Sequence, residues 1–302
     1  MLLTVVVDGD PVVWPAARVE TYSSSSTVVR NTVSPRDLVF DYHIQHDSIR
    51  RSNVESRRKV LTMTEAREIL DKAEQRFRRS LTRQIPSPRD ACDQRLYPFN
   101  PQNKELWPLV GMHVKVSSLS PLSYGVDESY AIEVPPVVDN DGYIKISATT
   151  VYGILRAYQT LLQLLDFGWI DIGNSTSCCV DEAAFLLTKD APIQIFDEPE
   201  YRYRGLMIDT ARHYLPMNLI LHNLGAMEMN KLNVLHWHLT DSQSFPYRSD
   251  AFPELSRRGA YCEKCIYTKD DIQRVIQEAA DRGIRTILEI DLPGHSAGTQ
   301  CV

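Results

Sequence analysis

The sequence contains no long hydrophobic run and no strong excess of charge of either sign. Its 302 residues carry a formal net charge of -6 at pH 7, and no apolar run reaches the ~18–20 residues that a bilayer span needs. Mild acidity argues against a nucleic-acid binder, because such proteins neutralise phosphates with basic surfaces. The first apolar run, residues 1–7, has neither a basic stretch before it nor a small-residue cleavage site after it. We therefore predict neither a membrane span nor a convincing signal peptide.

Cysteine is also sparse. Six cysteines in a chain of this length exclude a small disulfide-dense scaffold. Cys262 and Cys265 form a lone C-x-x-C motif. A zinc site needs a second pair of ligands, and a thioredoxin-like redox site needs a strand-to-helix position, so neither has its required context here. We interpret the motif as a loop whose cysteines are incidental or form a disulfide.

Hydrophobic residues make up 43% of the chain, which is enough for a sizeable core. Residues 20–60 are polar and include a run of four serines, which predicts loop or poorly ordered chain. Residues 64–82 follow a helical period, and from residue 112 the period changes to two, which is typical of strands. A second helix is predicted from about 149 to 166, and its broad apolar stripe suits packing on a sheet.

The chain is predicted to change architecture near residue 198. We divide it into a poorly defined N-terminal segment (1–60), an α+β domain (61–198) and a second domain (199–302). Within the second domain, short continuous apolar runs alternate with amphipathic helices, and a loop containing aromatic residues and proline precedes the last helix. This alternation predicts parallel β/α units, which are buried on both faces. In the α/β fold class, functional side chains gather beyond the carboxyl ends of the strands.

Polar side chains follow or end each of the three apolar runs, 205–209, 232–241 and 286–291. They are Asp209, Thr210, Arg212 and His213 after the first, His236, His238 and Asp241 in the second, and Asp291 and His295 at the third. Because parallel strands present their carboxyl ends at one edge of a sheet, these groups are expected to converge. Convergence from three strands predicts a functional site.

Three interpretations of this site stay open on the residues alone. In the first, His236, His238, Asp291 and His295 bind a divalent metal that activates water, although the apolar residues around the two histidines suit core packing equally well. In the second, Asp241 orients His295, and His295 orients a further acid without a metal. The third is a carbohydrate-binding module that uses the same groups without an acid catalyst.

Three long stretches, YRGLMIDTARHYLPM, NKLNVLHWHLTDSQSFPYRSDAFPELSRRGAY and YTKDDIQRVIQEAADRGIRTILEIDLPGHS, closely resemble the catalytic barrel of the β-N-acetylhexosaminidases of glycoside hydrolase family 20. The similarity runs from about residue 129 to residue 296. Its earlier part is similar to the family's N-terminal α+β domain, an antiparallel sheet backed by helices. The resemblance therefore implies that domain, followed by the first three β/α units of an incomplete TIM-type barrel.

The resemblance implies hydrolysis of terminal, non-reducing N-acetylglucosamine or N-acetylgalactosamine in β linkage. Family members retain configuration by substrate assistance, an exception to the two-carboxylate scheme: the sugar's acetamido oxygen attacks the anomeric carbon, an Asp orients that group and a Glu protonates the leaving oxygen. No cofactor or metal is implied. The implied partner is a glycan or glycoconjugate ending in N-acetylhexosamine, with homodimerisation possible for a full-length protein and a lysosomal or extracellular location.

Four residues match positions with family roles. Arg204 matches the arginine that grips the sugar hydroxyls. Asp241 and His295 match the pair that buttresses the acid, so we expect them to be hydrogen-bonded to each other or nearly so. Asp291 matches the active-site aspartate that opens the D-x-P-G-H turn. By the same comparison, the two histidines of the second run look structural.

The family's adjacent Asp-Glu catalytic pair, usually after Gly-Gly on the fourth strand, does not occur in these 302 residues. The Asp-Glu pairs at 127–128, 181–182 and 197–198 lie in or beside the N-terminal domain without that context. We therefore predict a truncated family member, cut after three of eight β/α units and inactive by itself.

Overall fold

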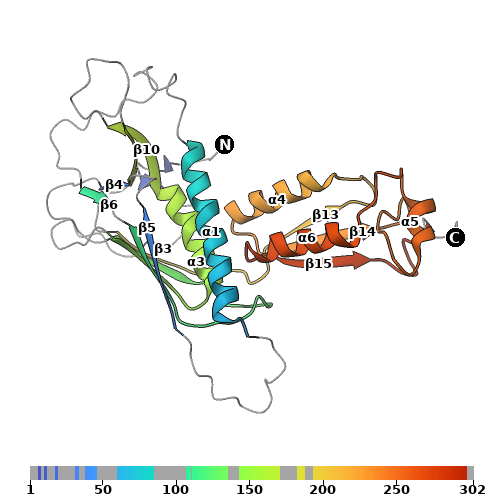
Figure 1. Cartoon of the computed structure of the whole chain (residues 1–302), viewed down its shortest axis with the longest axis horizontal. Coiled ribbons are helices and arrows are strands. Elements are labelled where there is room, and N and C mark those ends of the chain that lie inside the picture. Colours follow the sequence, from blue (N-terminus) through green and yellow to red (C-terminus); the bar gives the residue numbers. More distant parts are fainter. Residues whose placement is uncertain are drawn as a thin grey trace, which may run out of the picture. The chain divides into compact units, whose positions relative to one another are not determined.

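A computed structural model divides the chain into two compact units (Figure 1). The first unit comprises Met1–Pro121 and Val126–Glu200, and the second comprises Leu122–Gly125 and Tyr201–Val302. The structure describes residues 6–7, 10–11, 18–19, 31–33, 38–45, 60–84, 107–109, 111–134, 143–170, 182–187 and 193–297. The assignment of residues 1–60, 61–198 and 199–302 to separate segments remains a prediction.

The first unit is built on a mixed six-stranded sheet. Its strand order is β3 (Arg18–Val19), β12 (Ile193–Asp197), β8 (Tyr130–Val134), β9 (Tyr143–Ala148), β7 (Gly111–Val116) and β5 (Val39–Ile44). Neighbours from β3 to β9 pair antiparallel, whereas β9, β7 and β5 pair parallel. The purely antiparallel sheet implied by the family resemblance is therefore wrong for this chain.

Further strands of the first unit form two smaller sheets. One has four strands, in the order β10 (Leu165–Ile170), β11 (Glu182–Leu187), β4 (Asn31–Val33) and β6 (Trp107–Leu109). The other is a pair formed by β1 (Val6–Val7) and β2 (Asp10–Pro11). These strands add to the first unit but supply none of the predicted site residues.

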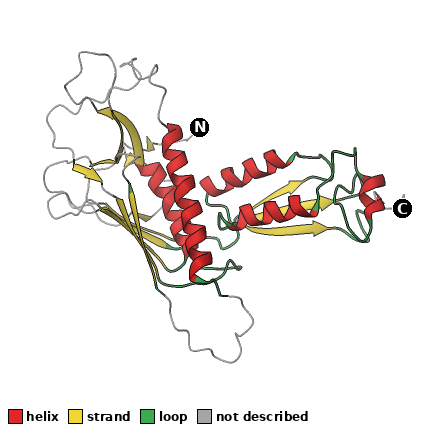
Figure 2. Cartoon of the chain, viewed as in Figure 1, coloured by secondary structure: helices red, strands yellow, loops and turns green. Residues whose placement is uncertain are grey.

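Two helices of the first unit, α1 (Met63–Gln84) and α3 (Val151–Leu164), pack against each other (Figure 2). The predicted apolar face of α1 is buried, including Ala66, Leu70 and Phe77. Helix α3 is buried along almost its whole length, so its predicted scaffold role is consistent with its packing. No helix in the described part of the chain is long and apolar enough to cross a membrane.

Strand β5 corrects the prediction that residues 20–60 form only loop. Exposed side chains alternate with half-buried ones along this strand, because successive side chains of a strand point to opposite faces. Phe40 stacks on Tyr42 and meets Phe77 of α1 edge to face. The alternation was present in the sequence, but the polar residues around it obscured this edge strand, and β4 in the same region was missed as well.

The second unit contains a three-stranded parallel sheet in sequential order. Strands β13 (Gly205–Asp209), β14 (Val234–Thr240) and β15 (Arg285–Ile290) are neighbours in that order, which confirms the predicted adjacent parallel strands. Helix α4 (Met217–Met229) connects the first two, and α5 (Pro253–Gly259) and α6 (Lys269–Ala280) lie between the second and third. Helix α5 occupies part of the predicted loop, so that segment was only partly anticipated.

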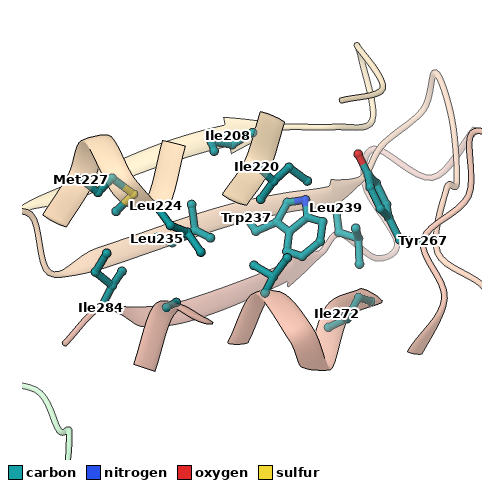
Figure 3. Close-up of a cluster of buried hydrophobic side chains, with 12 residues drawn as sticks. Ile208, Ile220, Leu224, Met227, Leu235, Trp237, Leu239, Tyr267, Ile272 and Ile284 are labelled. Carbon is teal, nitrogen blue, oxygen red and sulfur yellow. The ribbon is translucent and has the colours of Figure 1, made fainter. Parts of the chain in front are cut away.

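Helices α4 and α6 share one hydrophobic core with the sheet (Figure 3). At its centre Trp237 is fully buried, and its indole Nε1 donates a hydrogen bond of 2.8 Å to Thr210 Oγ1. Leu235 and Leu239, two residues to either side, belong to the same core. Because side chains alternate across a strand, His236 and His238 point to the opposite face of the sheet.

Candidate active site

A row of polar side chains crosses the face of the sheet opposite the helices. The strand register places His238 of β14 directly beside Asp209 of β13 and Glu289 of β15. The imidazole Nδ1 of His238 lies 2.9 Å from Glu289 Oε2, and its Nε2 lies 2.9 Å from Asp241 Oδ2. Both ring nitrogens therefore face carboxylates.

Asp241, just beyond β14, is the centre of the cluster. Its side chain is only 1% exposed, yet its Oδ2 atom lies within 2.9 Å of His238 Nε2, 2.7 Å of His295 Nδ1 and 2.6 Å of Arg212 Nη2. Burial by itself raises the pKa of Asp241, but hydrogen bonds from the two histidines and the Ser242 amide outweigh burial and hold that pKa at about 2. Asp241 is therefore an ionised carboxylate at neutral pH.

The carboxylates on either side set the charge of His238. Burial lowers the pKa of His238, but the hydrogen bonds to Glu289 and Asp241 outweigh it, so that pKa is raised. The same hydrogen bond to His238 lowers the pKa of Glu289. Both effects favour an imidazolium between two carboxylates, because an opposite charge within hydrogen-bonding distance favours the charged form.

Arg212 reaches the cluster from the turn after β13. Its Nη1 donates to Asp209 Oδ2 at 2.6 Å, and Asp209 Oδ1 accepts the backbone amides of Ala211 and Arg212 at 3.0 Å. The hydrogen bond that Arg212 donates to Asp209 is the main reason why the pKa of Arg212 is raised. With a side chain 37% exposed, Arg212 links Asp209 and Asp241 while facing solvent.

His295 completes the cluster from the turn after β15. Its side chain is 57% exposed, and its backbone lies in the left-handed region at φ 55°, which is uncommon for a residue other than glycine and is found disproportionately at functional sites. The 2.7 Å contact to Asp241 confirms the expected hydrogen bond between these two residues. Because Asp241 is ionised, it accepts a hydrogen bond from His295 Nδ1–H, so Nε2 is the acceptor nitrogen of the neutral ring.

Asp291 lies close to both ends of the cluster. Among the described residues, two groups bring potential metal-binding atoms within 4.8 Å of one another: His238 with Glu289 and Asp291, and Asp241 with Asp291 and His295. His236 is in neither group, and its Nε2 is hydrogen-bonded to Glu289 Oε2 at 2.5 Å. The structure therefore does not gather His236, His238 and Asp291 as the metal interpretation required.

Arg204 is not part of this cluster. It precedes β13 and so lies at the amino edge of the sheet, five residues before Asp209, or about 16 Å along an extended strand. Its Nε donates to the carbonyl of Lys231 at 2.9 Å, and its Nη1 donates to the carbonyl of Tyr201 at 2.7 Å. Arg204 therefore lies at the opposite edge of the sheet from Asp241 and His295, and its role in sugar binding stays a prediction.

Sequence reasoning named Arg212 among the converging polar groups without giving it a role, and it overlooked Glu289. A signal for Glu289 was present: it lies two residues before Asp291, so the two carboxylates share one face of the strand. A signal for Arg212 was its position three residues after Asp209, beyond the carboxyl end of β13 rather than before its amino end.

Comparison with known proteins identifies the family. Residues 201–300 match the model of the glycosyl hydrolase family 20 catalytic domain, and residues 13–164, half of the chain, match a model described as beta-acetyl hexosaminidase like. Beta-hexosaminidase 3 of Arabidopsis thaliana is 41% identical over 189 residues, covering 62% of this chain and 33% of that protein. Beta-hexosaminidase subunit beta of Homo sapiens is 42% identical over 173 residues, covering 56% of this chain and 27% of that protein. The matched region thus spans about a third of these relatives.

Solved structures support the α/β fold with mixed sheets. A chitobiase from Flavobacterium johnsoniae superposes with a TM-score of 0.62 at 23% identity, over 94% of this chain and 35% of that one. Streptomyces plicatus N-acetyl-beta-hexosaminidase, solved in complex with Thio-NAglucal, gives a TM-score of 0.57 at 21% identity, over 95% of this chain and 47% of that one. At these identities the likeness concerns the fold alone, and it agrees with the family models: the chain belongs to glycosyl hydrolase family 20, the β-N-acetylhexosaminidases.

Proposed function

We propose that the carboxyl edge of the β13–β14–β15 sheet binds a terminal, non-reducing N-acetylglucosamine or N-acetylgalactosamine in β linkage. The proposed reaction of the whole protein is hydrolysis with retention by substrate assistance, in which the sugar's acetamido oxygen attacks the anomeric carbon. The observation that carries the proposal is the buried, ionised Asp241 hydrogen-bonded to an exposed His295, in a chain of this family.

Asp241 and His295 act as positioning residues in this proposal. The carboxylate of Asp241 holds the Nδ1–H of His295, which fixes the ring's tautomer and leaves Nε2 to accept a hydrogen bond from a protonated carboxylic acid. An acid that donates to this nitrogen is oriented for proton transfer to the leaving oxygen. General acid catalysis of this kind contributes about 10²–10⁴-fold to a rate.

Arg212 replaces Arg204 as the proposed sugar-binding arginine. A guanidinium offers five N–H donors, and the hydrogen bonds of Arg212 to Asp209, Asp241 and Gln243 use three of them. The second Nη2–H faces His295 Nδ1 at 3.3 Å, and the second Nη1–H is proposed to donate to a sugar hydroxyl at the exposed edge. Asp291, beside Asp241 and His295, is proposed as a second polar group that contacts the bound sugar.

These 302 residues alone are proposed to bind sugar without hydrolysing it. They lack the family's Gly-Gly-Asp-Glu segment, so neither the proton donor nor the carboxylate that aligns the acetamido group is among them. A chromogenic β-N-acetylglucosaminide assay on the purified chain is expected to give no turnover above background, with a full-length relative as the positive control. Robust turnover that Asp291→Asn abolishes would contradict this proposal and require a catalytic carboxylate within these residues.

The parallel sheet is proposed to be the first three β/α units of a TIM-type barrel. Support comes from the sequential strand order, from the parallel pairing and from helices that connect successive strands. The polar cluster at the carboxyl edge fits this architecture, because barrel active sites lie at that end of the strands. An experimental structure in which the three strands belong to a flat open sheet would exclude the barrel.

Two alternatives share the same residues. A non-catalytic carbohydrate-binding fragment predicts the same sugar affinity as the main proposal and differs only in the activity of the whole protein. A metal-dependent hydrolase is favoured only by the two donor groups around Asp291, and calorimetric titration with zinc tests it directly. The absence of a cofactor, homodimerisation and a lysosomal or extracellular location stay predictions.

A further inference from the structure

The C-x-x-C motif closes a tight turn beside the proposed sugar site. Cys262 and Cys265 form a disulfide, and the Cys265 amide donates to the Cys262 carbonyl at 2.9 Å. Cys262 is exposed and Cys265 is half-buried. The sulfurs thus bridge the two ends of a short surface loop.

The residues that flank this turn hold the segment carrying Arg212. On one side, the Tyr261 hydroxyl donates to the backbone carbonyl of Arg212 at 3.1 Å. On the other side, the buried Tyr267 hydroxyl donates to the Leu215 carbonyl at 2.5 Å and accepts the Leu215 amide at 3.2 Å. The turn therefore fastens residues 212–215 at two points, and the disulfide keeps the two fastening tyrosines together.

The two tyrosines differ in how firmly the rest of the fold holds them. The Tyr267 ring packs against Tyr214 and Trp237 in the core, with ring centroids 5.0 and 5.1 Å apart. Tyr261 is 52% exposed, and the preceding Ala260 amide bonds back into helix α5. Because Tyr261 is exposed and Tyr267 is packed in the core, opening the disulfide should disturb the Tyr261 hydroxyl contact more than the contacts of Tyr267, while the Ala260 hydrogen bond still holds the backbone before Tyr261.

We propose that Cys262–Cys265 is a reversible thiol–disulfide exchange site through which a dithiol reductant weakens the Arg212 end of the sugar site. A thiolate of the reductant attacks one sulfur, the Cys262–Cys265 bond breaks, and the reductant's second thiol resolves the mixed disulfide. The protein gains two electrons and two protons as two thiols, and the reductant leaves as its own disulfide. Exposure favours this reaction, because exposed disulfides are the labile ones.

The coupling of the disulfide to Arg212 is independent of the proposed function, but its effect on sugar affinity rests on that function. Loss of the single hydrogen bond from Tyr261 should weaken N-acetylglucosamine binding about three- to tenfold, the factor that one hydrogen bond typically corresponds to. The oxidised state is therefore the tighter-binding one.

The test follows the side-chain Nε–H signal of Arg212 in the arginine-labelled 302-residue chain, assigned by its loss in Arg212→Lys. Excess dithiothreitol is added under native conditions, alkylation and peptide mapping follow each cysteine, and circular dichroism checks that the fold is intact. Alkylation of Cys262 and Cys265 together with a shift of the Arg212 signal is expected. The Cys262→Ser/Cys265→Ser double variant should show the reduced-state signal without reductant.

Tyr261→Phe is the matched variant, because it keeps the disulfide and removes only the hydroxyl. Its Arg212 signal should resemble the reduced state already when oxidised, and it should respond little to dithiothreitol. The inference is overturned if the disulfide resists reduction until the chain unfolds, or if the Arg212 signal is identical in both redox states. If the oxidised chain does not bind N-acetylglucosamine, the proposed function is rejected. If the Arg212 signal still shifts on reduction in that case, the coupling of the disulfide to Arg212 stands.

Discussion

The two edges of the parallel sheet each carry an arginine, and the two arginines have different kinds of partner. At the amino edge, Arg204 donates to the backbone carbonyls of Tyr201 and Lys231. At the carboxyl edge, Arg212 donates to the carboxylates of Asp209 and Asp241. The first arginine satisfies main-chain groups where strand and loop meet, whereas the second holds two acids in place beside solvent.

This difference shows why a position in a motif does not by itself fix a role. Both arginines lie in the same stretch, YRGLMIDTAR, eight residues apart. Backbone carbonyls around a guanidinium indicate a structural contact, because those groups need partners in the folded state. Carboxylates around an exposed guanidinium indicate a charged site, because ion pairs perturb pKa values where ligands bind.

The largest expected effect of substitution is at the buried centre of the carboxyl edge. Asp241→Asn keeps the shape but removes the charge that His238, His295 and Arg212 share. Removing one partner of a buried charge cluster should lower the free energy of unfolding by about 2–4 kcal/mol at neutral pH. Urea unfolding measures this change, with the exposed Asp250→Asn as the control. Equal losses in the free energy of unfolding for the two variants would mean that the charge of Asp241 stabilises the fold no more than an exposed carboxylate does.

The pH dependence of stability provides a second test of the same residue. The folded-state pKa of Asp241 is about 2, below its ordinary value of 3.8, so its ionised form stabilises the fold above about pH 4. That contribution should fade as the pH falls from about 4 to 2, where the folded protein also takes up the proton. The stability gap between wild type and Asp241→Asn should therefore be constant near neutrality and shrink over this acidic interval. A gap unchanged down to pH 2 would contradict a depressed pKa.

At the amino edge, Arg204→Lys should cost stability but not sugar affinity. Lysine keeps the charge but cannot reach two carbonyls with a planar fork, so we expect unfolding to become easier by about 1–2 kcal/mol. Binding of N-acetylglucosamine should stay within error of wild type. Urea unfolding and calorimetric titration on the same sample separate the two effects.

The matched change at the carboxyl edge, Arg212→Lys, should lower sugar affinity and leave stability nearly unchanged, which is the reverse of the effect expected for Arg204→Lys. Stability should change little, because exposed ion pairs contribute little. Affinity for N-acetylglucosamine should fall about five- to tenfold, because lysine loses the planar guanidinium and the N–H donor proposed to contact a sugar hydroxyl. If Arg204→Lys rather than Arg212→Lys weakened sugar binding, the assignment of the two edges would be reversed.

Much of the second unit could be predicted from the sequence because its local signals are strong. Continuous apolar runs at 205–209 and 286–290 predicted parallel strands, but the prediction that both faces are buried is wrong here, because Met207, Ile287 and Ile290 are exposed. The capping box between Thr268 and Asp271 marks the start of α6. The hydrogen bond between Asp241 and His295 followed from placing both beyond neighbouring strands. Strand β5 was missed because a short strand within a polar region has little local signal.

The roles of the arginines could not be predicted from local pattern, because they depend on partners that only the fold brings together. The acceptors of Arg204 include the carbonyl of Lys231, 27 residues away, and those of Arg212 include Asp241 on the next strand. Glu289 was overlooked for the same reason: its importance comes from strand register, which sets it beside His238. The sequence pattern predicted that polar groups meet at the carboxyl edge of the sheet, but it did not predict which of them form hydrogen bonds and ion pairs.

The most direct test of the central claim is to map N-acetylglucosamine binding on the isotope-labelled 302-residue chain by NMR chemical-shift changes. We predict weak, saturable binding with a dissociation constant on the order of millimolar. The shifted signals should cluster at the carboxyl edge, at Asp209–His213, Asp241 and Asp291–His295, and Arg212→Lys should weaken them while Arg204→Lys leaves them unchanged. Saturable shifts centred on Arg204 and Lys231, or no saturable shifts in a folded chain, would contradict the claim.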